Sequence, residues 1–293
     1  MFIQEFERKA FHQALVIKEG ADFPFTDLQI MIRDLEMYSF GEYIHEEELR
    51  IIVEEGFGRV FLAFDGTQHP HQLVSYQVIL FKEYGDKDGE IEHRLQPVLE
   101  QRRQTDNLVM HDDVHFDETT TIYFHLIGTR LGFEGLGISS RLKKEAIHRL
   151  TPEQKNKIKK VCIRINNAAS LLVNMKVLGV LPTGFKPIDR SMIGSRETNF
   201  NLETIPSVLP MLDAVMVKEF LDQGIIQLVT NDEKPIKNKL LIPFKVGDQS
   251  DLADGILESR LRKIMDSGYQ IKGVFKASDL NQAGDSFFYA EMD

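Results

Sequence analysis

The chain has 293 residues, a formal net charge of −10 and 42% apolar residues, a composition ordinary for a soluble globular protein with a sizeable core. This length fits one large domain and one smaller one. The acidic balance argues against a broad nucleic-acid-binding surface and is compatible with a cationic small molecule or peptide as partner. No apolar run approaches the ~20 residues that span a bilayer, so no membrane segment is predicted.

The start of the chain, "MFIQEFERKA", carries acidic residues where a secretory signal has a basic head and an apolar middle. The single cysteine, Cys162, lies in the strand-like segment "KVCIRI" and cannot form an internal disulfide. A buried, reduced thiol is the plain interpretation. Together these features predict a cytoplasmic protein.

Periodicity predicts alternating strands and helices in the first part of the chain. A strand is expected at 14–20, a helix at 26–39 capped by Thr26, and a second helix at 45–56. Two strands, 58–64 and 73–81, follow and suggest a hairpin. The charged stretch 82–118 is expected to be partly helical at most. It precedes a long β-branched and aromatic strand at 118–130.

Further along, a helix is expected up to about residue 150, then a strand at 158–165 and a helix at 166–179. The last 90 or so residues change character. They predict a helix within 205–224, a helix at 251–268 capped by Asp251, and four strands at 225–230, 239–246, 269–275 and 286–292. No internal repeat is visible. The expected organisation is a main domain of residues 1–200 and a C-terminal lobe of residues 201–293.

Three glycines separate the long strand from the helix that follows it. They are Gly132, Gly135 and Gly137, within "LGFEGLGISSRLKK", and we call residues 131–137 the glycine turn. The first amides of a helix lack partners and carry partial positive charge. Glycines remove the Cβ atoms that would keep a phosphate from those amides. The segment 134–140 is therefore a candidate pyrophosphate site, with Ser139, Ser140 and the basic side chains of 141–144 as extra donors.

Two better-known phosphate loops fit this turn poorly. A dinucleotide fingerprint would place a third glycine where Ser140 stands and an acidic residue after the next strand, where the chain has "INN". A Walker loop needs Gly-Lys-Ser/Thr, which is absent. A plain strand–helix connection with incidental glycines stays open as the alternative, and the "RLKK" segment at 141–144 equally fits a solvated helix face.

The order of these elements and the motif at the turn resemble the GNAT superfamily of acyl-CoA N-acyltransferases. The signature of that family is Arg/Gln-x-x-Gly-x-Gly/Ala at the turn from its fourth strand to a helix, and "FEGLGISSRL" at 133–142 aligns with it. Glu134 stands where the family has Arg or Gln, and Ser139 where it has Gly or Ala. The resemblance spans about residues 13–186.

The second mark of the family is Asn-x-x-Ala at the start of a later helix, followed by Tyr and Lys. Here Asn167, Ser170, Asn174 and Lys176 occupy that segment, and the helix contains no Tyr. The family's Tyr often protonates the departing thiolate. Asn174 or Val173 takes its place in this chain, depending on the register.

The resemblance implies an α/β fold with a GNAT-like mixed, splayed central sheet flanked by helices and a C-terminal α+β extension. It implies transfer of an acyl group from acetyl-CoA, or another acyl-CoA, to an amine by direct attack in a ternary complex. Pantetheine would bind the strand backbone at Ile127, Gly128 and Thr129. The residues implied for the remainder of the cofactor are Gly135, Leu136, Gly137, Ile138, Ser139, Ser140, Arg141 and Asn167.

Candidates for the acid and base come from the long strand and the later helix. Tyr123, His125 and Ile127 alternate onto one face, and His125 can carry a proton near neutral pH. Glu118 at the head of the strand is an alternative base, and Asn174 is a candidate at the acid position. A core histidine bonded to backbone is the competing interpretation of His125.

Two further expectations concern the segment before the long strand and the function as a whole. His111, Asp112, Asp113 and His115 have metal-ligating side chains, but no second ligand cluster supports them, so no metal site is predicted. The insert 82–118 is expected to shape the acceptor pocket. The competing function is a non-catalytic module that binds CoA or another protein.

Overall fold

The computed structural model describes residues 10–39, 44, 46–56, 58–67, 71–81, 121–158, 160–165, 168–185, 192–197, 213–230, 234–245, 256–282 and 286–292. The chain forms two compact units. The first contains residues 1–161 and 198–202, and the second contains residues 162–197 and 203–293. Each unit is described separately below. The expected boundary at residue 200 stays a prediction.

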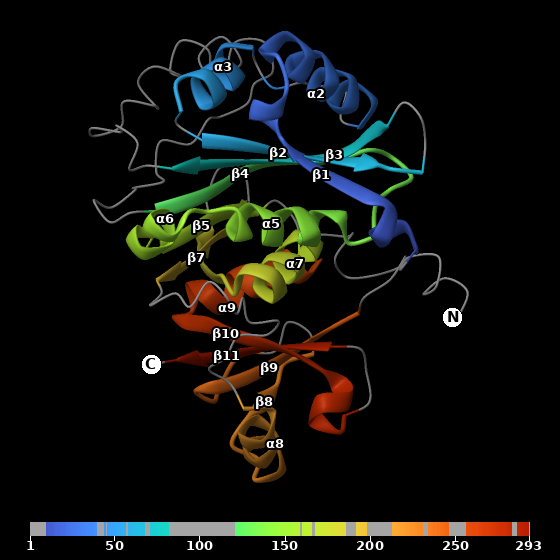
Figure 1. The fold of residues 1–293 in the computed structure, drawn as a ribbon. Helices are drawn as coiled ribbons and strands as arrows, with labels where there is room; N and C mark the ends of the chain where they lie inside the picture. The colour runs from blue at the N-terminus through green and yellow to red at the C-terminus, as the bar shows by residue number, and fades with distance from the viewer. Residues whose placement is uncertain are drawn as a thin grey trace. The chain divides into compact units, whose positions relative to one another are not determined.

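The first unit contains four antiparallel strands in sequence order: β1 Leu15–Glu19, β2 Gly58–Asp65, β3 Gln72–Phe81 and β4 Thr121–Thr129. The β2 and β3 strands are buried along nearly their whole length, because helices cover both faces of the sheet (Figure 1). The expected strand at 14–20 and the expected hairpin are confirmed. Asp65 shapes the turn after β2, since its Oδ1 accepts hydrogen bonds from the amide and hydroxyl of Thr67.

Helices α2 Phe25–Ser39 and α3 Glu46–Glu54 cover one face of this sheet, and α5 Ile138–His148 covers the other (Figure 1). Both early helices were expected. The expectation that Thr26 caps the first of them is wrong, because α2 begins at Phe25 and the amides of Asp27 and Leu28 donate to the carbonyl of Pro24. Leu28, Ile32 and Leu35 form the buried stripe of α2.

A short helix that the sequence analysis missed, α6 Pro152–Lys157, follows α5. Its signal is present in the sequence: Thr151 caps it, with Pro152 in the first turn and Gln154 completing a capping box.

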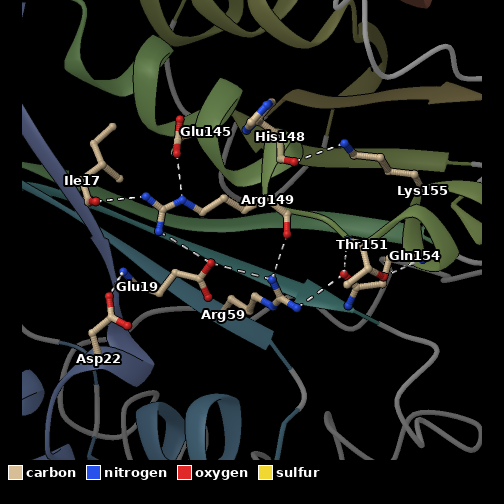
Figure 2. A network of polar contacts seen from close by, with 10 residues as sticks. All are labelled: Ile17, Glu19, Asp22, Arg59, Glu145, His148, Arg149, Thr151, Gln154 and Lys155. Atoms are coloured by element: carbon tan, nitrogen blue, oxygen red, sulfur yellow. Dashed lines mark hydrogen bonds and ion pairs between the residues drawn. The ribbon is translucent and has the colours of Figure 1, made fainter.

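Arg149 and Arg59 anchor the C-terminal end of α5 to strands β1 and β2 (Figure 2). The guanidinium of Arg149 donates to the carbonyl of Ile17 and to Glu145 Oε1, and the guanidinium of Arg59 donates to the carbonyl of Arg149 and to Gln154 Oε1. Glu19 lies between the two arginines, 3.8 Å from Arg149 and 3.9 Å from Arg59. This network fixes α5 on the sheet and thereby fixes the position of its N-terminus.

The second unit begins within β5 Lys160–Ile165, whose first two residues belong to the first unit. It continues through α7 Ala168–Leu178 and an antiparallel pair, β6 Leu181–Phe185 with β7 Met192–Glu197. The sequence analysis predicted β5 and α7 but not the β6–β7 pair. Cys162 is a buried free thiol, as expected.

The C-terminal part of this unit is an α+β arrangement. A four-stranded sheet has the order β10-β11-β9-β8, formed by Tyr269–Lys276, Ser286–Met292, Lys239–Phe244 and Gln227–Leu228. Helices α8 Ala214–Asp222 and α9 Ile256–Asp266 accompany it, with Asp213 capping α8. Five of these six elements fall within the predicted ranges, and β10 extends one residue past its predicted end at 275. A core cluster includes Val217 of α8, Leu241 of β9 and Tyr289 of β11.

Candidate functional site

Strand β4 carries one extra residue at His125. In its pairing with β3, Leu126 lies opposite Val78 and Phe124 lies opposite Ile79, so His125 has no counterpart on β3. Such a β-bulge interrupts the alternation of side chains and re-aims the bulged residue, and bulges are frequent beside active sites. The sequence analysis assumed unbroken alternation along this strand. The bulge corrects that assumption at the residue of greatest chemical interest.

His125 forms a short contact with a buried carboxylate. Its Nε2 lies 2.7 Å from Oε1 of Glu48, whose side chain is 2% exposed, whereas the imidazole is 20% exposed. A carboxylate accepts a hydrogen bond, so we assign the proton of neutral His125 to Nε2. The lone pair then lies on Nδ1, which is buried and has no hydrogen-bond partner within the described part of the chain. This arrangement of a base oriented by a carboxylate is the one that general-base catalysis uses.

Tyr123 packs beside this histidine. The two ring centroids lie 5.6 Å apart at an interplanar angle of 45°. Tyr123 is buried, so its ring restricts how the imidazole can turn. The structure therefore brings together two of the four residues that the sequence analysis proposed for acid–base chemistry.

A second buried carboxylate, Glu36, lies on α2, which covers the same face of the sheet as the α3 helix of Glu48. It accepts hydrogen bonds from the hydroxyl of Tyr76 and from the amide of Ile44. The ring of Tyr76 crosses the backbone of β4 at Gly128, where an added Cβ would lie 2.4 Å from a ring carbon. Gly128, predicted as a pantetheine contact, therefore has a packing role as well, because only glycine leaves room for Tyr76.

The glycine turn connects the end of β4 to the start of α5. Gly132, Gly135 and Gly137 all have positive φ, at 87°, 73° and 80°, a conformation that residues with a Cβ adopt at a cost. Gly137 is the N-cap residue of α5, and no side chain caps the helix there. The first turn of the helix also contains no acidic residue. Its amides are thus left without the side-chain acceptor that most helices supply.

The surroundings of the glycine turn are mixed in charge. The carboxylate of Glu134 folds back onto the turn, where its Oε2 accepts a hydrogen bond of 2.7 Å from the amide of Gly132. The guanidinium of Arg141 donates to the carbonyl of His12, which commits one of its nitrogens to the N-terminal segment. The ring of Phe133 contacts that of Phe11, with centroids 5.9 Å apart. An anion at the turn would meet both the helix amides and the charge of Glu134.

Lys143 is buried inside the first unit with an exposed fraction of 1%. Its Nζ lies 2.9 Å from Oγ of Ser139, one turn earlier on α5, and 3.1 Å from Oε1 of Gln77 on β3. Burial lowers the pKa of Lys143 from 10.5 to about 7, because desolvation penalises the ammonium form. Of the two alternatives left open for the basic run at 141–144, the solvated helix face is wrong for Lys143, although Lys144 is exposed.

We expect Lys143→Met to gain stability relative to the parent as the pH falls. The folded chain releases this proton at about pH 7 and the unfolded chain at 10.5, so the cost of burying the charge is full below pH 7 and vanishes above 10.5. The cost is on the order of 3–5 kcal/mol, partly offset in the variant by about 1–2 kcal/mol for two lost hydrogen bonds. Urea denaturation at about pH 6 and about pH 9.5 measures the difference. An equal difference at both pH values would contradict the assignment.

The remaining predicted residues fall into three groups. Ile127, Gly128 and Thr129 end β4, and they pair with Gln77, Tyr76 and Ser75 of β3. Leu136, Ile138, Ser139 and Ser140 lie at the turn and the first turn of α5. The third group lies outside the described residues and consists of Glu118, Asn167, Asp251 and the histidines and aspartates of 111–115. Within the described residues no cluster of metal-ligating side chains occurs, and no helix has the length and apolarity to cross a bilayer.

Asn174 belongs to α7 in the second unit and is completely buried. Its amide nitrogen donates to the carbonyl and hydroxyl oxygens of Ser170 at 2.7 and 3.2 Å, which uses both of its hydrogens. Its Oδ1 is buried without a partner within the described part of the chain. The role proposed for Asn174 as an acid stays a prediction, and its donors are already occupied within its own helix.

The sequence analysis missed Glu48 altogether, and it named Lys143 as an extra phosphate donor but missed its burial, although periodicity could have found both. Glu48 lies three and four residues before the buried Ile51 and Ile52, so it shares their face of α3. Lys143 is related in the same way to the buried Ala146 and Ile147. A charged residue in phase with an apolar stripe was the signal in each case.

No protein-family model and no curated protein matches the chain. Among solved structures, Arabidopsis thaliana NAA60 in complex with acetyl-CoA is similar at 15% identity and a TM-score of 0.41, covering 64% of this chain and 99% of that one. The NatC complex bound to Gag peptide and CoA is similar at 12% identity and a TM-score of 0.40, covering 63% and 99%. Ribosomal-protein-S5-alanine acetyltransferase from Vibrio fischeri is similar at 11% identity and a TM-score of 0.39, covering 64% and 94%.

Proposed function

We propose that this protein is an acyl-CoA-dependent N-acyltransferase that transfers an acetyl or other acyl group to an amine by direct attack in a ternary complex. The observation that carries the proposal is that strand β4 and the glycine turn after it place two functional groups close together in the sequence. The bulge of β4 presents His125, oriented by Glu48, and the same strand ends in a glycine turn that leaves the α5 amides uncapped. One strand thus supplies a base and, a few residues later, an anion site.

The base removes the obstacle to attack, which is the proton on the acceptor. An amine at neutral pH is an ammonium ion and cannot attack a thioester until it loses a proton. Nδ1 of His125 accepts that proton, and Glu48 stabilises the imidazolium that forms. The nitrogen then forms a bond to the acyl carbon, and the carbon–sulfur bond breaks with its electron pair going to sulfur. The second proton that the nitrogen must lose to become an amide passes to the thiolate, directly or through water, and CoA leaves as the thiol.

The glycine turn leaves room for the diphosphate of an acyl-CoA. An added Cβ would meet nothing within 4 Å at Gly132 or Gly135, so the space beside the turn is open to a ligand. The amides of Ile138, Ser139 and Ser140 begin α5, where the helix dipole favours an anion. Ile138 and Leu142 are buried beneath them, which holds the helix start on the core.

The charge of Glu134 opposes an anion at this turn, and its removal should tighten binding. We expect Glu134→Gln to bind CoA roughly 2–5-fold more tightly at low salt, since an exposed charge at a helix start is worth about 0.3–1 kcal/mol. The glutamine can still accept the hydrogen bond from Gly132. Titration calorimetry at two salt concentrations measures the change, which should shrink as salt rises.

The matched control for this variant is Glu54→Gln, which removes an exposed charge from α3 on the opposite helix layer. Its CoA affinity should equal that of the parent. If both variants, or neither, bind more tightly, the anion site does not lie beside Glu134.

A non-catalytic CoA-binding module is the second candidate, and Asn174 favours it. The family that the sequence resembles often has a Tyr acid in this helix, whereas the amide of Asn174 donates to Ser170 of its own helix. A module of this kind would bind CoA and transfer nothing.

The test that separates the two is an acetyl-CoA titration followed by a transfer assay over a panel of small amines and peptide N-termini. Binding with transfer to at least one amine supports the enzyme. Binding without transfer or thioester hydrolysis supports the module. Absence of binding at millimolar concentration overturns both.

A further inference from the structure

Lys143 is a buried lysine that has no anionic partner among the described residues. Its two contacts, Ser139 Oγ and Gln77 Oε1, are both neutral, and desolvation alone accounts for its lowered pKa. No carboxylate forms an ion pair with it within the described residues. Proteins rarely bury a lysine in this way, because the isolated charge is costly unless a partner arrives.

Lys143 is the central member of a hydrogen-bond chain that joins the two ends of the proposed site. Nε2 of Gln77 donates to the carbonyls of Val78 and Leu126, each at 2.8 Å, and Leu126 directly follows the bulged His125. Oε1 of Gln77 accepts from Lys143, and Lys143 also donates to Ser139. Because the Ser139 oxygen accepts from Lys143, its own hydroxyl hydrogen remains available for another acceptor at the first turn of α5.

Other charged groups near Lys143 already have partners of their own. Helix α5 packs on β2, β3 and β4, and the titratable or charged residues of these four elements are Arg59, Asp65, Tyr76, Tyr123, His125, Arg141, Lys144, Glu145 and His148. Arg59 lies near Glu19, Asp65 accepts a hydrogen bond from Thr67, and Glu145 accepts one from Arg149. Tyr76 donates to Glu36, His125 contacts Glu48, and Arg141 donates to the carbonyl of His12. The ring of Tyr123 packs on that of His125. Lys144 and His148 are exposed.

We propose that Lys143 is the counter-charge and positioning residue for the diphosphate of the acyl-CoA, acting from beneath the glycine turn through Ser139, and that it takes up a proton when the diphosphate binds. The inference rests on the proposed function, because it requires the diphosphate at the start of α5. A dianion one hydroxyl away favours the ammonium form of the lysine. The ammonium in turn orients the Ser139 hydroxyl toward the ligand.

Calorimetry of dephospho-CoA binding in buffers of different ionisation enthalpy tests the proton uptake. This ligand keeps the diphosphate but lacks the phosphomonoester, which would itself titrate near pH 6. At about pH 8, roughly one unit above the pKa of about 7, Lys143 is mostly neutral before binding. We expect an uptake close to one proton there, falling toward zero at about pH 6.

Lys143→Met is the matched variant, since it keeps the length of the side chain and removes the titrating group. It should bind dephospho-CoA without proton uptake at about pH 8 and with at least a tenfold loss of affinity. A second measurement needs no variant: the pKa of one lysine of the parent should lie near 7 by carbon-13 NMR and rise by about two units or more with ligand.

The outcomes distinguish failure of this inference from failure of the proposed function on which it rests. Binding without proton uptake, or equal uptake in the parent and Lys143→Met, overturns the role of Lys143 and leaves the acyl-CoA site standing. Failure of dephospho-CoA to bind the parent overturns the site and the inference together. Uptake that is present in the parent and absent in the variant supports both.

Discussion

Gly137→Val should reduce the affinity for CoA at least 100-fold. Gly137 is the N-cap of α5 at φ = 80°, where a β-branched residue is strained by about 1–3 kcal/mol. Its new Cβ methyl groups would also stand beside the amides that are proposed to hold the diphosphate. Titration calorimetry with CoA measures the loss, and circular dichroism confirms that the variant is folded.

Gly224→Val is the matched control for this prediction. Gly224 follows α8 in the second unit at φ = 66°, and an added Cβ there would meet no atom within 4 Å. The control therefore suffers a similar backbone strain and should lose stability while keeping CoA affinity. If Gly137→Val binds CoA as the parent does, the glycine turn is only a connection between strand and helix.

His125→Gln should lower kcat about 10²–10⁴-fold, the usual contribution of a general base. Glutamine can still donate from its amide to Glu48, so the buried carboxylate keeps a partner, but it offers no nitrogen that accepts a proton. The KM for acetyl-CoA should stay within about twofold, since His125 acts on the acceptor amine. Steady-state kinetics with a reactive amine measures both constants.

Two further variants complete this experiment. Glu48→Gln should lower kcat less, by roughly 10–100-fold. Glu48 orients the imidazole and stabilises its charged form, but it does not itself accept the proton. His148→Ala, on the exposed side of α5, should leave both constants unchanged. Undiminished turnover in His125→Gln at neutral pH would rule out His125 as the base.

The main strands could be predicted from the sequence because they are buried, and burial requires apolar side chains along their length. The β2 and β3 strands form nearly continuous apolar runs, and the actual strands end within one or two residues of the expected bounds. Helices α2 and α5 were equally visible from stripes such as Leu28, Ile32 and Leu35. The glycine turn was found because three glycines close together are conspicuous, and all three have positive φ.

The most informative part of the site could not be predicted from periodicity. A bulge at His125 depends on the register between β3 and β4, which a single strand sequence does not contain. The pairing of His125 with Glu48 joins residues 77 positions apart. Lys143 looked like part of a basic, solvated run, and only the packing of α5 on the sheet buries it. In each case tertiary context decided what local pattern left open.

A crystal structure of the complex with CoA tests the central claim most directly. We predict diphosphate oxygens within about 2.7–3.2 Å of the amides at residues 137–140, at the start of α5. CoA bound elsewhere on the chain, or a glycine turn with no ligand under saturating CoA, would contradict the account.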